Sequence, residues 1–209
     1  MINYIKMRYK QISELIKDKG WKAFIQAVMY SNRKAILVEK KLSEAVSRKD
    51  FLQKNNIQFI EITPETFHMD KFAFHSKNRM YKTMHYLKKG YCGHAIVKDN
   101  TIIGDIWYYA NNITFNAAQC PDIKWLKFEL TEGTVYSFDI YVVPNERGNS
   151  LSAALQTTAM YSLFAKGYSK AYAYYWADNI PAVWNTRVVN KWIEIRPVTV
   201  SRFLFWLKA

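Results

Sequence analysis

Hydrophobic and polar positions alternate with two different periods after residue 56, and their order predicts a succession of strands and helices. Runs rich in β-branched and aromatic residues predict strands at 57–62, 92–97, 102–109, 135–143, 171–176 and, as one or two closing strands, within 193–207. Apolar residues at helical spacing predict helices at 77–89, from 151 until Gly167, and at 179–189. Residues 98–101 are predicted to form a hairpin turn, and Thr63 is expected to open a further helix with Pro64 in its first turn.

The first 56 residues follow a different pattern. Two apolar stripes at helical spacing, over 5–16 and 21–29, are separated by Gly20, and a short apolar run at 36–38 predicts one strand. Residues 1–50 contain 12 Lys and Arg against 5 Asp and Glu, and basic amphipathic helices can lie in a membrane interface. We expect residues 1–56 instead to form a basic helical extension packed on or near a domain of residues 57–209. Membrane contact through residues 1–50 is then at most weak and peripheral.

The composition narrows the class of protein. Half of the 209 residues are hydrophobic, which is enough for a large core. No run approaches the roughly 18 apolar residues of a membrane span, and without an export signal the expected compartment is the cytoplasm. Cys92 and Cys120 do not form a C-x-x-C pair, and no His or Cys spacing indicates a metal. The net charge of +13 favours a polyanionic ligand, while the lack of a zinc finger, RNP motif or Arg-rich run argues against a nucleic-acid partner.

One strand–loop–helix junction stands out as a candidate anion site. Pro144 ends the strand at 135–143 because it offers no N–H to a neighbouring strand. The next helix begins near Leu151, and Asn149 or Ser150 is expected to cap it. Unpaired backbone N–H groups and the helix dipole act together at such a place. The junction therefore predicts binding of a phosphate-like group.

A family resemblance lies in this same junction. The GNAT superfamily of acyl-CoA N-acyltransferases carries Arg/Gln-x-x-Gly-x-Gly/Ala after a Val-x-Pro strand end. Here the corresponding residues are Val142-Val143-Pro144 and Arg147-Gly148-Asn149-Ser150-Leu151-Ser152. Serine stands at both of the later Gly or Ala positions, which it can occupy if the backbone φ angle stays negative there. The element order over residues 57–207 also resembles the GNAT fold, an α/β (α+β) fold with a mixed, mostly antiparallel central sheet flanked by helices.

The resemblance implies a binding mode for acetyl-CoA. The central strand and the next one should be parallel and splayed, and backbone groups of Ile140, Tyr141 and Val142 should meet the pantetheine arm and the thioester. The resemblance implies that backbone N–H groups hold the pyrophosphate, with Arg147 nearby, and that these come from Gly148, Asn149, Ser150, Leu151 and Ser152. Asn179 resembles the asparagine that members place before their last helix. Seven residues later, where many members have a tyrosine, this chain has Thr186.

Candidate catalytic groups lie on the central strand. Asp139 is the one acidic residue in an otherwise apolar strand, so it is the predicted general base, and the alternative is that it pairs with a Lys or Arg on a sheet face. Tyr141 is a candidate phenol. Glu129 and Asp105 are weaker candidates for the base, and His94, on a predicted strand, is a candidate acceptor-side group.

The resemblance therefore predicts an N-acetyltransferase that uses acetyl-CoA as co-substrate and no metal. The acceptor is expected to be a primary amine on a small molecule, and a nucleotide-linked amino-sugar of surface-polysaccharide synthesis is one candidate. Two alternatives remain open at this point. One is a catalytically inactive GNAT-like module that binds coenzyme A, and the other is a Fem-type aminoacyl transferase.

Overall fold

The computed structural model describes residues 29–110, 120–203 and 206–209, together with a few single positions between Tyr9 and Ile25. Most of the two helices predicted before residue 29 lies outside these described residues. Within the described part, none of the helices is long and apolar enough to cross a membrane.

Nine strands in the described residues form one sheet in the order β2-β4-β5-β6-β7-β1-β8-β9, with β3 beside β5. Their bounds are β1 (Met29–Lys41), β2 (Gln58–Ile62), β3 (Ala73–Phe74), β4 (Cys92–Lys98), β5 (Thr101–Ala110), β6 (Thr134–Val142), β7 (Lys170–Trp176), β8 (Ile193–Phe203) and β9 (Trp206–Lys208). The β3–β5 and β6–β7 pairs are parallel and the other pairs are antiparallel. The sheet is mixed and mostly antiparallel, as the sequence predicted.

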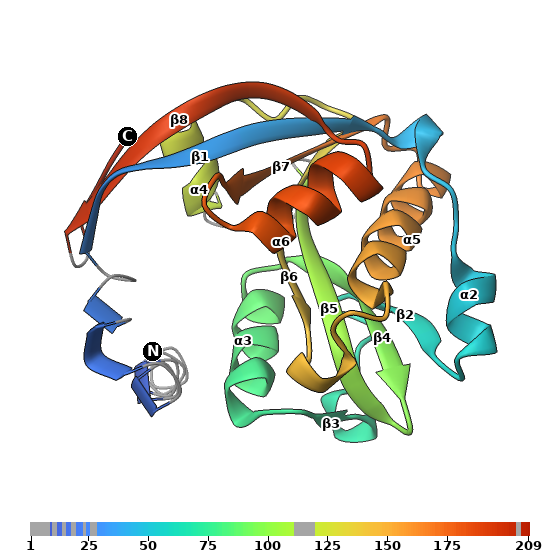
Figure 1. Ribbon diagram of the computed structural model, residues 1–209. Helices are drawn as coiled ribbons and strands as arrows, with labels where there is room; N and C mark the ends of the chain where they lie inside the picture. The colour runs from blue at the N-terminus through green and yellow to red at the C-terminus, as the bar shows by residue number, and fades with distance from the viewer. Residues whose placement is uncertain are drawn as a thin grey trace.

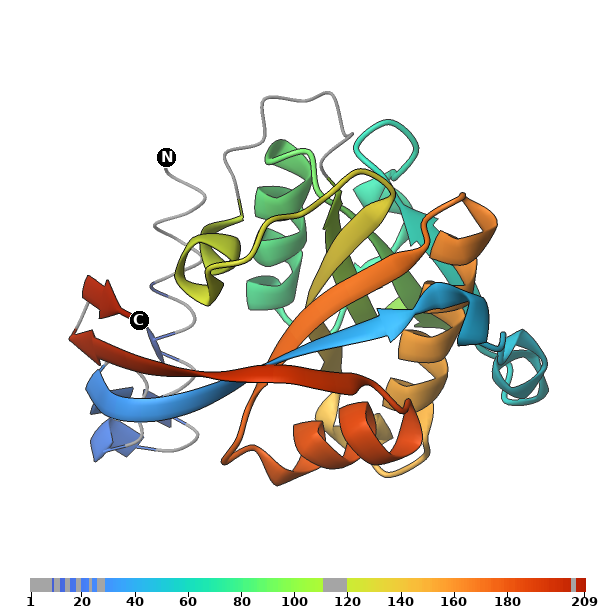
Figure 2. The ribbon, with the colours of Figure 1, turned by 90° about the horizontal axis from the view of Figure 1, so that it is seen from above.

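Helices cover both faces of this sheet (Figures 1 and 2). The helices α5 and α6 lie on one face, and α3 and α4 lie on the other. Their bounds, with those of the short helical turns, are α2 (Lys49–Lys54), α3 (Lys77–Lys88), α4 (Pro121–Leu126), α5 (Leu151–Ala165), α6 (Ile180–Val183), η1 (Leu42–Glu44), η2 (Met69–Lys71), η3 (Pro144–Glu146) and η4 (Trp184–Val189). The η4 segment continues α6 as a π-helix.

The prediction of a helix that begins at Thr63 is wrong. The segment after β2 is a turn, in which the Thr63 hydroxyl accepts a hydrogen bond from the Thr66 backbone N–H at 3.2 Å and lies 2.8 Å from the Thr66 hydroxyl. Threonine side chains that bond to nearby backbone groups compete with helical hydrogen bonds. The chain consequently reaches only the short η2 turn before β3.

The N-terminal part of the sheet corrects a second expectation. Residues 29–41 were expected to belong mainly to a helical extension with a short strand at 36–38, but they form the 13-residue strand β1. This strand lies between β7 and β8 and is antiparallel to both. Ala35, Leu37 and Val38 are buried there. The proposed extension over residues 1–56 therefore contains one strand of the central sheet.

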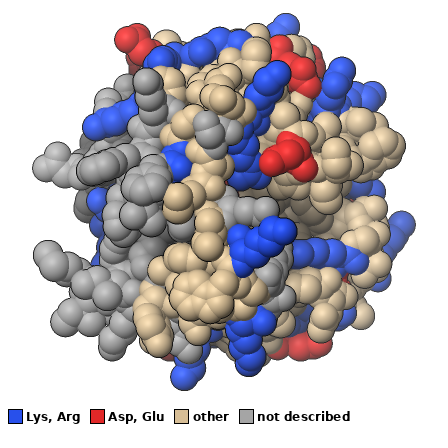
Figure 3. Space-filling view, turned by 60° about the vertical axis from the view of Figure 1, so that its left-hand side comes forward, with Lys and Arg blue, Asp and Glu red and all other residues tan. Residues whose placement is uncertain are grey.

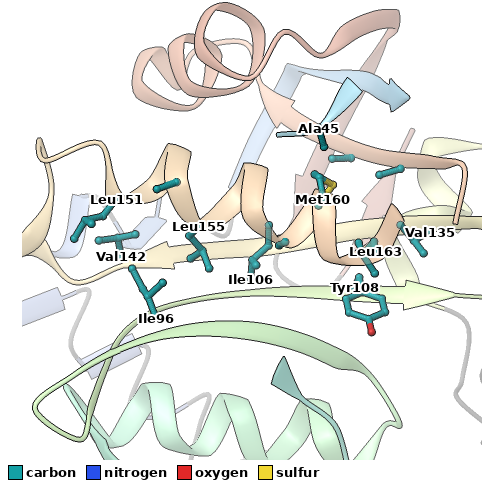
Figure 4. Close-up of a cluster of buried hydrophobic side chains, with 14 of the residues drawn as sticks. Ala45, Ile96, Ile106, Tyr108, Val135, Val142, Leu151, Leu155, Met160 and Leu163 are labelled. Carbon is teal, nitrogen blue, oxygen red and sulfur yellow. The ribbon is translucent and has the colours of Figure 1, made fainter. Parts of the chain in front are cut away.

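The largest buried cluster lies between α5 and the sheet (Figure 4). Leu151, Leu155 and Leu163 of α5 point toward the strands, where Ile96 and Val142 are among the residues that they face. Burying side chains of this size contributes about 1.5–3 kcal/mol each. The packing fixes the first turn of α5 directly beside the end of β6.

The strands β6 and β7 are in register for only three residue pairs, 134–136 with 170–172, although both strands continue further. The predicted splay of a parallel pair is therefore present. On its other side β6 pairs with β5, and this pairing has a bulge between the Trp107–Phe138 and Asp105–Tyr141 pairs. Asp139 lies in the bulge with φ of 50°.

Basic side chains lie at several separate places on the face drawn in Figure 3. In the view of Figure 3, Lys and Arg clearly outnumber Asp and Glu. This matches the 30 basic and 17 acidic residues of the whole chain.

Candidate functional site

The loop between β6 and α5 leaves a helix N-terminus open to solvent. Gly148, Asn149 and Ser150 are exposed, and Gly148 has φ of 88° with space for an added Cβ atom. The first hydrogen bond of the helix runs from the Ala154 N–H to the Ser150 carbonyl, at 2.9 Å. The N–H groups of residues 151–153 come before this bond and have no carbonyl partner within the helix.

Ser150 differs from its predicted role. It occupies the N-cap position of α5, but its side chain makes no capping hydrogen bond and its φ angle is 58°. The condition that φ stays negative at both serine positions is therefore wrong for Ser150, while Ser152 lies within the first turn of α5. The left-handed conformation of Ser150 lies directly between the loop and the first residue of α5.

Arg147 turns back toward β6. Its Nε atom donates a hydrogen bond to the Val142 carbonyl at 2.9 Å, and its guanidinium carbon lies 5.8 Å from the centre of the Tyr141 ring. This contact fixes the loop against the end of the strand. The predicted contact between Arg147 and a pyrophosphate stays a prediction.

Asp139 lies at the centre of a network of charged and polar groups from α3 and β5. Lys82 Nζ donates to its Oδ1 atom at 2.8 Å, while Arg79 Nη1 and the Tyr86 hydroxyl both donate to its Oδ2 atom at 2.9 Å. Arg79 also donates two hydrogen bonds to Asp105, one of them from Nε at 2.8 Å. We call Arg79, Lys82, Tyr86, Asp105 and Asp139 the Asp139 network.

This network is largely removed from water. The side chains of Arg79 and Asp105 are 7% and 1% exposed, and those of Lys82 and Asp139 are 23% and 20% exposed. Burial alone would raise the pKa of Asp139, but the positive charges of Arg79 and Lys82 outweigh it and hold that pKa below its ordinary value. The carboxylate is thus ionised at neutral pH and is a weak proton acceptor.

The position of Asp139 bears directly on its predicted role. The structural alternative, pairing with Lys or Arg on the sheet, is what the contacts show. Its role as general base stays a prediction, and a lowered pKa does not favour it. Tyr141, the second candidate, is half-buried with the Arg79 guanidinium carbon 4.7 Å from its ring centre.

Asn179 and Thr186 lie on the segment that follows β7. Asn179 caps α6, with its Oδ1 atom accepting from the Ala182 N–H at 3.3 Å. Thr186 is buried within the π-helix, and its carbonyl accepts from the Trp192 N–H at 3.0 Å. The structure thus places Asn179 at the start of the helix, as predicted, with its side-chain oxygen already engaged.

The other two candidate residues, His94 and Glu129, do not lie in the Asp139 network. His94 is fully buried, with its ring stacked against Phe59 and Tyr108 and its Nε2 atom 3.1 Å from the Ser162 hydroxyl of α5. It therefore cannot contact an acceptor, which corrects that expectation. Glu129 is exposed in the loop after α4. Across the residues that the structure describes, no group of His, Cys, Asp and Glu is arranged to hold a metal ion.

The helix α3 is part of this site, although its residues were not among the candidates predicted from the sequence. Arg79, Lys82 and Tyr86 recur at intervals of three and four residues, which places them on one face of α3. That polar spacing was the available signal. Only the apolar side of the same helix was used in the prediction.

The fold was compared with known proteins. No protein-family model matches the sequence, and no curated protein sequence matches it significantly. Solved structures are similar at low identity. One is a GCN5-related glucosamine N-acetyltransferase region of a fungal multi-domain GH3 β-N-acetylglucosaminidase, with a TM-score of 0.57 and 16% identity over 87% of this chain and 22% of that one.

Two further structures give the same result. A tandem GNAT protein from the clavulanic acid biosynthesis pathway has a TM-score of 0.53 at 10% identity, over 87% of this chain and 57% of that one. A GCN5-related N-acetyltransferase from Sphaerobacter thermophilus has a TM-score of 0.50 at 12% identity, over 87% and 56%. The chain thus spans less than two thirds of the length of each of these solved chains. At these identities the likeness concerns the fold.

Proposed function

We propose that this chain, which has the GNAT fold, transfers an acetyl group from acetyl-CoA to a primary amine. A fold alone does not define an activity, so the proposal depends on the site. The observation that carries it is the parallel β6–β7 pair, which separates after three residue pairs and leaves the remainder of β6 unpaired on that side, on the way to the loop and the open N-terminus of α5.

The open helix N-terminus fits the pyrophosphate of coenzyme A. Backbone N–H groups of residues 148–152 and the dipole of the 15-residue helix α5 both favour an anion there. Gly148 leaves room for close approach, because nothing lies within 4 Å of a Cβ atom added to it. We propose Gly148, Asn149, Ser150, Leu151 and Ser152 as the pyrophosphate-binding segment, with Arg147 beside it.

The free side of β6 fits the pantetheine arm. Beyond Tyr136 this strand no longer pairs with β7, so its backbone on that side can bond to an extended ligand. Ile140 is 37% exposed there. We propose that backbone groups of Ile140, Tyr141 and Val142 hold the arm, and that Asn179 contacts it from the N-terminus of α6.

The bound thioester would supply an activated acetyl group for direct attack by the amine in a ternary complex. Holding both reactants together accounts for much of the rate in such reactions. Backbone N–H groups of β6 can stabilise negative charge on the carbonyl oxygen. We propose that Tyr141 contributes a phenol to proton transfer. Asp139, the predicted general base, is ionised at neutral pH, but three donors from α3 occupy its carboxylate, so we propose that it orients β6 and does not take the proton itself.

The acceptor class is proposed by analogy. The fungal structural neighbour is described as a glucosamine N-acetyltransferase region, so amino-sugars, free or nucleotide-linked, are the first acceptors to examine. A donor made inside the cell agrees with the cytoplasmic location expected from the sequence. We propose no nucleic-acid partner.

One residue favours a second candidate function. Thr186 stands where many GNAT members have a tyrosine, and it is buried in a π-helix. A chain without that phenol could bind coenzyme A and lack turnover. This would make it a catalytically inactive binding module.

The experiment combines binding with turnover. Calorimetric titration of coenzyme A and of dephospho-coenzyme A should show binding, and Ser150→Tyr, which fills the loop, should abolish it in a folded protein. Release of free thiol from acetyl-CoA should then depend on an added amine, in a panel that includes glucosamine and nucleotide-linked amino-sugars. Binding without turnover would support the inactive module, and unchanged binding by Ser150→Tyr would remove the main support for both functions.

A further inference from the structure

We infer that Arg79, Lys82 and Tyr86 of α3 act through Asp139 as positioning residues, which hold the bulge of β6 in the shape that the acetyl-transfer site requires. The inference rests on the function proposed above and assigns Asp139 a structural place in it. According to this inference, contacts from α3 on one face of the sheet fix the backbone geometry of β6, the strand proposed to contact acetyl-CoA.

The first argument is the backbone of Asp139. Aspartate adopts positive φ more readily than most residues with a Cβ atom, but φ of 50° within a strand interrupts the extended backbone and is retained here by contacts from neighbouring elements. The bulge places two residues, Asp139 and Ile140, opposite the single residue Ile106 of β5. The bulge therefore changes the direction of β6 just where the proposed contacts with the pantetheine arm begin.

The second argument is the number of contacts that enforce this conformation. Both carboxylate oxygens of Asp139 are engaged by α3, one by Lys82 and one by Arg79 together with Tyr86. Arg79 Nη2 also lies 3.4 Å from the Asp139 carbonyl, so the main chain and the side chain are held from the same helix. A carboxylate bound in this way is an anchor for the backbone.

The third argument is that Arg79 itself cannot move freely. Asp105 accepts two hydrogen bonds from it, and Trp107 Nε1 donates to the same carboxylate at 2.8 Å. The Arg79 guanidinium also stacks on the ring of Tyr141. Arg79 thus contacts the residue before Ile140 and the residue after it, and so spans the bulge.

The fourth argument is charge balance. Arg79 and Lys82 carry two positive charges, and Asp105 and Asp139 carry two negative charges, within one poorly hydrated region. Removing one partner of a buried pair leaves the other charge uncompensated, which is worse than removing both. A general base has no such property, because its loss cannot be repaired by deleting a neighbouring cation.

This difference defines the test. Asp139→Asn, Lys82→Met and the double variant are compared with the wild type. A positioning role predicts that Asp139→Asn lowers kcat by about 10²-fold with a smaller effect on KM, since misplaced reactants lose rate first. The double variant, with one cation and one carboxylate remaining, should recover to a kcat within about threefold of the wild-type value. A double variant as slow as Asp139→Asn would overturn the inference in favour of a base.

A matched ion pair serves as control. Lys170 Nζ lies 2.8 Å from Glu39 Oε2, the same length as the Lys82–Asp139 pair, between β7 and β1. Glu39→Gln, Lys170→Met and their combination should leave kcat unchanged and show little coupling. If kcat falls in the single variants and recovers in the double variant equally for both ion pairs, the effect is common to ion pairs in general. That result also overturns the inference.

A second readout needs no substrate. Thermal unfolding of the same four proteins measures whether Asp139→Asn lowers Tm more than the double variant does. If the wild type transfers acetyl groups to none of the amines, the proposed function fails while this thermal cycle still decides the role of the network. Strictly additive changes in Tm would show that Lys82 and Asp139 act independently and would contradict the inference.

Discussion

At the scale of single residues, the two serines at the glycine or alanine positions of the loop motif have different backbone conformations. Ser150 has φ of 58° and no capping hydrogen bond from its side chain, whereas Ser152 lies in the regular first turn of α5. A left-handed conformation is disfavoured for any residue with a Cβ atom. Glycine is disfavoured within a helix. The same substitution should therefore have opposite effects at these two positions.

We expect Ser150→Gly to raise the free energy of unfolding by about 0.5–1 kcal/mol, because relief of the left-handed strain exceeds the added freedom of the unfolded chain. Ser152→Gly should lower it by about 0.5 kcal/mol. Urea unfolding of both variants measures the two values. Changes of equal sign would show that the backbone at Ser150 is not strained in solution.

His94 is a second residue with a clear physical consequence. Burial lowers its pKa to about 3, with the positive charges of Lys166 and Lys49 adding to that effect. Its Nδ1 atom has no hydrogen-bond partner among the described residues. The folded protein therefore holds a neutral imidazole over a pH range in which the unfolded chain binds a proton.

From these values we expect stability to fall as pH is lowered from about 6.5 toward 3, by up to about 1.4 kcal/mol per pH unit from this group. His94→Phe keeps the stacking with Phe59 and Tyr108 but cannot titrate, so its stability should depend less on pH between 5 and 6.5. Chemical unfolding at several pH values tests this. His75→Gln, at an exposed position, should retain the wild-type slope, and an equal slope in His94→Phe would refute the assignment.

At the scale of elements, the sequence predicted those structures whose information is local. The β4–β5 hairpin, β6, β7, α3 and α5 each have their own period and turn residues, and all were predicted within a few positions. The strand β1 was mostly missed because charged residues interrupt its apolar pattern. The sequence allowed pairing of Asp139 with a Lys or Arg but could not identify the partner, because Arg79 and Asp139 are 60 residues apart and no local pattern links them.

The contact between α5 and η4 is a second arrangement of elements that no local sequence pattern predicts. Gln156 of α5 is buried, and its Oε1 atom accepts from Asn185 Nδ2 at 2.9 Å and from Asn190 Nδ2 at 2.8 Å. One amide oxygen thus holds both ends of the π-helix. π-helical turns are rare and are frequently found at functional sites.

We predict that Gln156→Met destabilises the protein by about 1–3 kcal/mol, because two amide donors lose their common acceptor. Hydrogen exchange should become faster in residues 184–190 and stay slow in the interior of α5. The same replacement at Gln53, which is exposed on α2, provides the control. Uniform acceleration across the chain would contradict a local role.

At the scale of the whole molecule, the position of β1 decides which part of the N-terminal region is dispensable. The division into an extension of residues 1–56 and a domain of residues 57–209 stays a proposal, yet β1 connects β7 to β8 within the sheet. Residues before Met29 are therefore the part whose removal leaves the described sheet complete.

A chain of residues 29–209 keeps every strand of the described sheet, so it should unfold cooperatively. A chain of residues 43–209, which lacks β1, should lose cooperative unfolding, because β8 and β9 no longer join the sheet. Calorimetry and near-UV circular dichroism distinguish the two. Cooperative unfolding of residues 43–209 would show that the sheet holds together without its β7–β1–β8 connection.

The central place of β1 also has a consequence for synthesis on the ribosome. Glu39 precedes its partner Lys170 by 131 residues, and Arg33 precedes Asp178 by 145 residues. At translation rates of roughly 5–20 residues per second, β1 waits about 7 to 30 seconds before β7 exists. During that interval the apolar residues of β1 and both of its edges lack their partners in the sheet and are open to other nascent chains and to chaperones. The strand β1 is thus made before its two neighbours in the described sheet and takes its place only after β7 and β8 have been made.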